Sequence, residues 1–124
     1  MPAMTHPLLS VALGGALGAV LRALAGTWLA RDGFPVAVLA VNVAGSLAIG
    51  VLAGLALRGG LAGWQPFLVT GVLGGFTTFS AFSLETVALI ERGEGAAAGL
   101  YVVLSVGLSV AAAALGLAAA RGLA

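Results

Sequence analysis

The densest group of polar residues in this chain of 124 residues lies within an otherwise apolar stretch around residue 75. Glycines and hydroxyl side chains follow one another there, at Gly71, Gly74, Gly75, Thr77, Thr78, Ser80, Ser83 and Thr86. Adjacent glycines followed by two β-branched threonines form a poor helix interior. We therefore expect a break in this helix, which would free main-chain carbonyls, and such oxygens suit a hard cation without any carboxylate. The alternative is an intact, kinked helix whose hydroxyls bond the carbonyls four residues earlier.

Donors suited to an anion occur close by. Phe79 and Phe82 are three residues apart and therefore share a helix face. An aromatic ring has a partially positive edge. Ring edges that face a narrow pore would therefore contact an anion without presenting a full positive charge, which would hold the anion too tightly. Otherwise the two rings simply pack. Asn42 is the one carboxamide inside any apolar stretch, where it either makes an interhelical hydrogen bond or offers an N–H donor to a polar pathway.

Hydroxyls recur every fourth residue in the last apolar stretch, at Tyr101, Ser105 and Ser109. At 1.5 Å per residue they form a donor track roughly 12 Å long, unless they are back-bonded hydroxyls on a closely packed face. Arg22 and Glu85 also lie inside apolar stretches, and each either snorkels to the interface or lines a vestibule. Donors outnumber acidic groups among these residues, so the passenger we expect is an anion.

The apolar stretches that carry these residues predict a small integral membrane protein. The chain is 61% hydrophobic and 7% charged, with a mean hydropathy of +1.20, whereas about a quarter of a soluble domain is normally charged. Stretches of about 20 apolar residues can each cross a bilayer as a helix. Four such spans are predicted in one transmembrane domain covering 1–124, at about 8–30, 35–57, 66–90 and 96–120. The short connections between them predict an all-α, up-down-up-down unit.

Composition also excludes several classes of protein. The absence of cysteine removes disulfide scaffolds, thiol nucleophiles and the common structural zinc sites. The single histidine, His6, lies in the N-terminal tail, so the serines of the spans have no base and we expect no catalytic residues. A net charge of +1 provides no basic patch for nucleic acid. Cleavage of the first span as a signal peptide at Ala23–Ala25 is disfavoured, because Arg22 interrupts its apolar core.

The arginines at the span ends are evenly divided. Arg58 and Arg121 fall on one side of the four spans, and Arg31 and Arg92 fall on the other. Orientation follows the excess of Lys and Arg in short loops, and here there is none. We therefore expect insertion in both orientations, which would let two opposed copies pair. A weak bias set by another determinant is the alternative.

Glycines four residues apart occur along all four predicted spans. The pairs are Gly14 and Gly18, Gly50 and Gly54, Gly71 and Gly75, and Gly95 and Gly99. This spacing puts small residues on one helix face and predicts close packing of helices within lipid.

Three segments taken in order resemble the Fluc (CrcB) family of fluoride channels. The run from Gly71 to Ser83, GVLGGFTTFSAFS, looks like the family's GxxGGxTTFSTF signature. Residues 14–22, GGALGAVLR, are similar to its GGxxGAxxR segment, and residues 41–46, VNVAGS, to its VNxxGS segment. The resemblance extends over all four predicted spans.

This resemblance implies a passive channel in the cell (plasma or inner) membrane that exports fluoride and so lowers its toxicity. It implies a homodimer of antiparallel subunits, in contact with membrane lipid, with two fluoride pores and one structural sodium ion at the dimer centre. By the match, the main-chain carbonyls of Gly74 and Thr77 would bind the sodium ion. The fluoride pathway would be lined by Asn42, the ring edges of Phe79 and Phe82, and the hydroxyls of Ser105 and Ser109, with Tyr101 and Glu85 near one end and Arg22 by a vestibule.

The sequence departs from the family pattern at three positions. Val38 stands where a threonine precedes the pore asparagine, Ala23 where an aromatic often follows the arginine, and Ala81 where a threonine separates the phenylalanines. Two other functions compete with a channel. A small multidrug or cation transporter of similar size needs a glutamate in its first span, which here has only Arg22. A membrane assembly subunit would need the glycine faces but not the polar residues.

Overall fold

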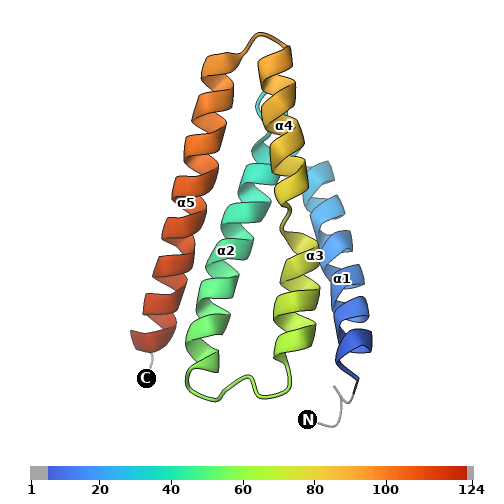
Figure 1. Ribbon diagram of the computed structural model, residues 1–124, viewed down its shortest axis with the longest axis vertical. Helices are drawn as coiled ribbons and strands as arrows, with labels where there is room; N and C mark the ends of the chain where they lie inside the picture. The colour runs from blue at the N-terminus through green and yellow to red at the C-terminus, as the bar shows by residue number, and fades with distance from the viewer. Residues whose placement is uncertain (1–5, 123–124) are drawn as a thin grey trace.

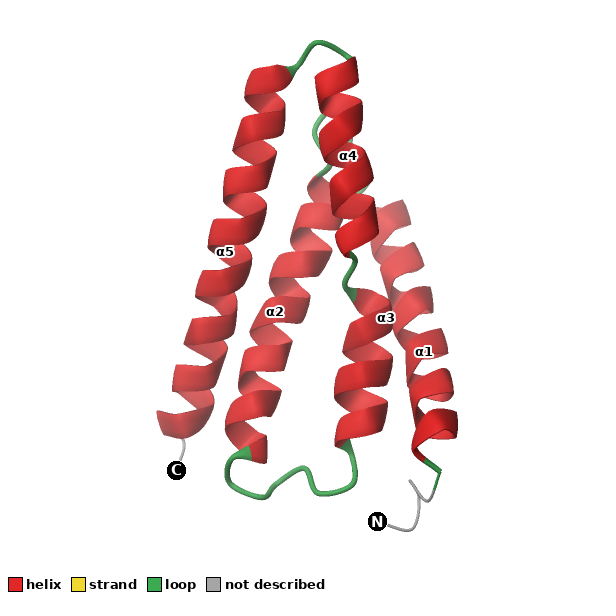
Figure 2. Ribbon diagram, in the orientation of Figure 1, coloured by secondary structure: helices red, strands yellow, loops and turns green. Residues whose placement is uncertain are grey.

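The computed structural model describes residues 6–122, and all the regular secondary structure in this range is helical (Figures 1 and 2). The elements in chain order are α1 (Pro7–Trp28), α2 (Val36–Ala56), η2 (Pro66–Leu73), α3 (Gly74–Phe76), α4 (Phe79–Glu91) and α5 (Gly95–Gly122). Four helical stretches are long and apolar enough to cross a bilayer: Pro7–Trp28, Val36–Ala56, Pro66–Glu91 and Gly95–Gly122. The predicted all-α architecture with four spans is confirmed. The outermost residues of the predicted domain, 1–5 and 123–124, lie outside the described range.

The helical stretches run alternately up and down, and their connections lie at the two ends of the bundle (Figure 1). The turn between α4 and α5 shows how the sequence sets these reversals. Gly93 has a φ of 77°, which favours glycine, and its N–H donates to the Ile90 carbonyl at 2.9 Å. The Glu94 N–H donates to the Leu89 carbonyl at 2.9 Å, which completes a Schellman motif. Gly59 ends α2 with the same φ of 77°.

Helix α1 packs directly against η2 and α3 through its glycines. A Cβ on Gly14 would collide with the Phe67 carbonyl, and one on Gly18 would collide with the Val72 carbonyl. From the other side, a Cβ on Gly75 would collide with the Gly15 carbonyl. The close approach of these backbones therefore requires glycine, as the spacing predicted.

Helices α2 and α5 form the second close pair. A Cβ on Gly50 would meet the Ala113 carbonyl, and one on Gly116 would meet the Leu47 carbonyl. The predicted pair Gly95 and Gly99 behaves differently, because a Cβ at either position would meet no atom of the described chain within 4 Å. Of the four glycine pairs, this one has no packing role within the described part of a single chain.

Arginine side chains donate hydrogen bonds to main-chain carbonyls at both ends of the bundle. At one end, Arg92 Nη2 donates to the Gly33 carbonyl at 2.9 Å, and its Nε lies 3.1 Å from Glu94 Oε2. At the other end, Arg58 Nη1 donates to the Ala120 carbonyl at 3.4 Å. The two arginines therefore lie on opposite sides of the spans, as the sequence indicated.

The interior of the bundle is small. Tyr101 and Leu89 are its largest fully buried side chains among the described residues, and Phe34, Val38 and Phe82 pack around them. Large apolar side chains instead cover the outer faces of the helices, including Leu8, Trp28, Val103 and Leu115. A hydrocarbon environment accommodates such a surface, whereas water does not.

Candidate functional site

The third helical stretch changes from a π-helix to an α-helix, and two extended residues then separate it from a second α-helix. Residues 66–73 form the π-helix η2, which continues into the short α3. Thr77 and Thr78 then have extended backbones, with φ and ψ of −85° and 157° and of −152° and 120°. Helix α4 starts at Phe79, so two extended residues separate α3 from α4 (Figure 2).

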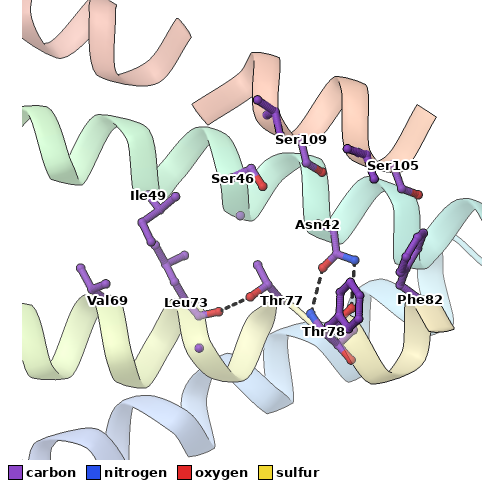
Figure 3. A pocket seen from close by; sticks show the side chains of 15 residues that line it. Asn42, Ser46, Ile49, Val69, Leu73, Thr77, Thr78, Phe82, Ser105 and Ser109 are labelled. Atoms are coloured by element: carbon purple, nitrogen blue, oxygen red, sulfur yellow. Dashed lines mark hydrogen bonds between the residues drawn. The ribbon is translucent and has the colours of Figure 1, made fainter. Parts of the chain in front are cut away.

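Asn42 of α2 clamps the extended segment. Its Oδ1 accepts from the Thr78 N–H at 2.9 Å, and its Nδ2 donates to the Thr78 carbonyl at 3.0 Å (Figure 3). Both polar atoms of the carboxamide therefore contact one residue of another helical stretch. Of the two roles that the sequence left open for Asn42, the interhelical hydrogen bond is present. The second hydrogen on Nδ2 is still available to a further acceptor.

Two more side chains contact backbone groups around the extended segment. The Thr78 hydroxyl accepts from the Ala81 N–H at 3.0 Å, which makes Thr78 the N-cap of α4. Arg22 Nε of α1 donates to the Gly75 carbonyl at 3.1 Å. Arg22 thus binds main-chain oxygen on α3, an interaction that its position in the sequence did not predict.

Three hydroxyls of this stretch donate to main-chain carbonyls four residues earlier. Thr77 Oγ1 donates to the Leu73 carbonyl at 2.9 Å (Figure 3), Ser83 Oγ to the Phe79 carbonyl at 2.9 Å and Thr86 Oγ1 to the Phe82 carbonyl at 2.8 Å. Back-bonded hydroxyls of this kind were expected for an intact, kinked helix, yet here they occur beside two extended residues. They are satisfied locally and leave no donor for a passenger.

A groove of about 470 Å³ runs along the extended segment between η2, α2, α4 and α5. It brings together seven of the ten predicted site residues: Asn42, Gly74, Thr77, Phe79, Phe82, Ser105 and Ser109. Figure 3 shows that Ser105 and Ser109 of α5 face the groove from the side opposite Thr77. Ser46, four residues after Asn42, also lines it and was missed, although this spacing puts both on one face of α2.

The hydroxyls on α5 differ from those on the third stretch. Tyr101 Oη, Ser105 Oγ and Ser109 Oγ are all buried and make no hydrogen bond within the described part of the chain. The hydroxyls of Tyr101 and Ser105 are neighbours, but their geometry does not meet that of a hydrogen bond. Buried hydroxyls normally have a partner, so these three are available to a group that the described part of the chain does not itself supply.

The two phenylalanines begin an aromatic row. The ring centroids of Phe79 and Phe82 are 5.4 Å apart, and Phe82 lies 5.3 Å from Tyr101. Tyr101 in turn makes an edge-to-face contact with Phe34 at 5.6 Å. Phe79, at the open end of the row, is 78% exposed although it lines the groove. This ring therefore borders the groove, while most of its surface is left uncovered by the described chain.

The remaining predicted residues lie around the groove. Arg22 lines a second cavity of about 240 Å³, together with Ala23, Val38 and Ala81, the three positions that depart from the family pattern. Thr78 lines both cavities and therefore lies between them. Glu85 is half-buried on α4 and carries its charge near Tyr101, beyond the walls of both cavities.

The ligand atoms at the groove are neutral oxygens and N–H groups. No group of three or more His, Cys, Asp or Glu residues that would hold a metal ion occurs in residues 6–122.

Comparison with known proteins identifies the family. The protein-family model described as "CrcB-like protein, Camphor Resistance (CrcB)" matches residues 9–117. The chain belongs to the CrcB family. It is 57% identical over 123 residues to the Fluoride-specific ion channel FluC of Ruegeria sp. (strain TM1040), with 96% of this chain and 98% of the relative covered. The protein of the same name from Roseobacter denitrificans is 58% identical over 120 residues, covering 93% of this chain and 95% of the relative. With four membrane-spanning helices, this member of the CrcB family is a multi-pass protein of the cell membrane.

Proposed function

We propose that this CrcB-family protein is a fluoride-selective passive channel that exports fluoride across the cell membrane and so lowers fluoride toxicity. The observation that carries the proposal is the groove where buried hydroxyls that have no hydrogen-bond partner in residues 6–122 meet a carboxamide and two phenylalanine rings. The relatives from Ruegeria and Roseobacter, both named fluoride-specific ion channels, support the choice of anion. Such a channel is not an enzyme.

Fluoride passes the groove by exchanging water for protein donors. The ion is small and strongly hydrated, so a narrow pore must replace its hydration shell at close range. Asn42 donates through the second hydrogen of Nδ2, and Ser105 and Ser109 donate through hydroxyls that make no other hydrogen bond in the described chain. Phe79 and Phe82 contribute the positive edges of their rings. None of these groups carries a full charge that would hold the ion.

Arg22, Glu85 and Tyr101 act at the ends of this pathway. The Arg22 cavity touches the groove through Thr78 and provides a positively charged vestibule. Tyr101 extends the hydroxyl track away from Ser105, towards Glu85. The first span has no acidic residue, so the proton exchange of a cationic drug transporter lacks its carboxylate.

We further propose that the channel is an antiparallel homodimer in which each of two pores is built from both subunits. Support comes from the Phe79 ring, which lines the groove and yet is 78% exposed in the single chain. A second copy would cover this ring and close the groove. Equal numbers of arginines at the two ends of the spans permit the copies to insert in opposite orientations.

A structural sodium ion at the dimer centre completes the proposal, with the Gly74 and Thr77 carbonyls as its ligands. These residues fit the ion, because the extended segment removes the N–H groups that a continuous α-helix would direct at both carbonyls. Carbonyl oxygens are suitable ligands for a hard cation. One chain offers this pair, and the second copy would supply an equal one. The ion would hold the two subunits together at the interrupted helices.

Fluoride efflux from liposomes containing the purified protein tests this function. The vesicles are loaded with potassium fluoride, and a fluoride electrode follows efflux after valinomycin is added to carry potassium. Fast efflux that requires both protein and valinomycin, with chloride retained, is the expected result. Vesicles without protein are the control. No efflux from a folded protein, or equal efflux of chloride, would contradict the proposal.

A further inference from the structure

The hydrogen bonds around the extended segment show why two particular carbonyls are open. In a continuous α-helix, the Gly74 carbonyl would accept from the Thr78 N–H, and the Thr77 carbonyl would accept from the Ala81 N–H. Here the Thr78 N–H donates to Asn42 Oδ1 at 2.9 Å, and the Ala81 N–H donates to Thr78 Oγ1 at 3.0 Å. Both N–H groups are therefore diverted by hydrogen bonds in which Thr78 takes part.

The neighbouring carbonyls are accounted for in a different way. The Gly75 carbonyl accepts from Arg22 Nε at 3.1 Å, and the Thr78 carbonyl accepts from Asn42 Nδ2 at 3.0 Å. Before the interruption, the Thr77 N–H still makes its helical bond to the Leu73 carbonyl at 2.9 Å. The carbonyls of Gly75 and Thr78 thus accept hydrogen bonds from side chains. The carbonyls of Gly74 and Thr77, in contrast, lose the N–H donors that a continuous helix would provide.

We propose that Thr78 is a positioning residue for the bound cation, because it keeps two N–H groups away from the Gly74 and Thr77 carbonyls. This inference rests on the sodium site of the proposed function. Thr78 does not itself bind the ion in this arrangement. Its N–H is held by Asn42, its hydroxyl caps α4, and its extended backbone, with a φ of −152°, follows from both bonds.

The hydroxyl of Thr78 is the part that can be tested separately. Thr78→Val keeps the β-branched shape and the N–H that bonds Asn42, but it removes the acceptor of the Ala81 N–H. The Ala81 N–H then turns to the Thr77 carbonyl, four residues before it, and competes with the cation. Thr78→Ser keeps the hydroxyl and is expected to behave as the native protein does.

A hydroxyl without this role provides the matched control. Ser83 Oγ donates to the Phe79 carbonyl of its own helix at 2.9 Å and lines neither cavity of the described chain. Ser83→Ala therefore removes one hydroxyl from the same stretch and leaves the acceptor of the Ala81 N–H intact. Thr78→Ala, which has less bulk than valine, serves as a second variant where Thr78→Val does not give a folded dimer.

The experiment measures the melting temperature of the purified full-length protein in detergent while sodium chloride replaces N-methyl-D-glucamine chloride at constant ionic strength. For the native protein, Thr78→Ser and Ser83→Ala, we expect the melting temperature to rise with sodium from one shared onset concentration, because stabilisation by a ligand grows with the logarithm of its concentration above the dissociation constant. For Thr78→Val, we expect this onset to move to about tenfold higher sodium, the usual scale of one lost N-cap bond. A purely structural defect would lower the melting temperature equally at every sodium concentration and leave the onset unchanged.

The outcomes separate this inference from the function on which it rests. If the native protein depends on sodium and the onset concentration is unchanged in Thr78→Val, the role of Thr78 alone would be overturned. A native protein without any sodium dependence would overturn the sodium site and this role with it, whereas fluoride efflux from liposomes would still decide the channel.

Discussion

Phe79 and Phe82 allow the aromatic part of the pathway to be tested at the scale of single residues. Phe79→Ile and Phe82→Ile keep an apolar side chain but remove the positive ring edge that would face the anion. We expect either change to abolish fluoride efflux from liposomes while the dimer still elutes intact in size-exclusion chromatography. Phe67→Ile is the control, since Phe67 packs against Trp64 at 6.1 Å and does not line the groove. Undiminished efflux in both groove variants would refute the assigned pore.

Ser109 should show opposite effects on transport and stability. Its hydroxyl is buried without a partner in the described chain, and such a group costs about 1–3 kcal/mol. Ser109→Ala should therefore leave the melting temperature unchanged or raise it. Efflux should fall by about tenfold or more, because a hydrogen bond to a charged group is worth about 1.5–3 kcal/mol. Thr86→Val is the matched control, as that hydroxyl already bonds the Phe82 carbonyl, and a drop in efflux as large as that in Ser109→Ala would argue against a specific track.

Residue types could be predicted from the sequence more readily than their partners. Asn42, Ser105 and Ser109 stood out because polar groups are rare inside apolar spans, and all three line the groove. The bonds from Asn42 to Thr78 and from Arg22 to Gly75 join residues 36 and 53 positions apart. No local pattern specifies such pairs, because they depend on how the helices pack. Thr78 carried one usable signal, since threonine directly before a helix is a common N-cap.

At the scale of elements, composition predicted the positions of the four spans well, but it did not predict the type of helix that each residue range forms. The four membrane-length helices follow directly from runs of apolar residues between short polar connections. The segment Gly-Gly-Phe-Thr-Thr favoured a local loss of helix, and Thr77 and Thr78 are extended there. Residues 66–73, in contrast, have the composition of an ordinary apolar helix, yet they form a π-helix packed on α1. Nothing in their sequence distinguishes this winding from an α-helix.

The contact between α1 and the third stretch can be tested with one glycine. In Gly18→Val, the added Cβ would collide with the Val72 carbonyl and lie 2.9 Å from the Phe76 nitrogen. Backbone atoms cannot move aside as a side chain can, so we expect the free energy of unfolding to fall by about 1–3 kcal/mol. Thermal or denaturant unfolding in detergent measures it. Gly26→Ala on the same helix has no neighbour within 4 Å and should be neutral or stabilising by up to about 1 kcal/mol; equal losses in the two variants would contradict a specific contact.

At the scale of the whole molecule, the two ends of the bundle carry equal numbers of arginines, and one arginine at each end bonds a main-chain carbonyl. Arg92 bonds the Gly33 carbonyl at one end, and Arg58 bonds the Ala120 carbonyl at the other. Each of these bonds links two segments that are distant in the sequence. Arg31 adds a further positive charge at the Arg92 end, and Arg121 adds one at the Arg58 end. Because neither end has more arginine than the other, the membrane has little basis for choosing an orientation.

This balance predicts that added positive charge will select one orientation and abolish transport. Ala62→Lys with Gln65→Lys biases the connection between α2 and η2, and Ala30→Lys with Asp32→Lys biases the opposite end. Expressed alone, each double variant should insert in a single orientation and lose fluoride efflux, because no opposed copy remains to complete the groove. Co-expression of the two should restore efflux. The chain has no cysteine, so one cysteine introduced at either end reports orientation through labelling by a membrane-impermeant thiol reagent. Full efflux from a variant shown to insert in one orientation would exclude the antiparallel dimer and require a pore formed by parallel subunits or by one chain.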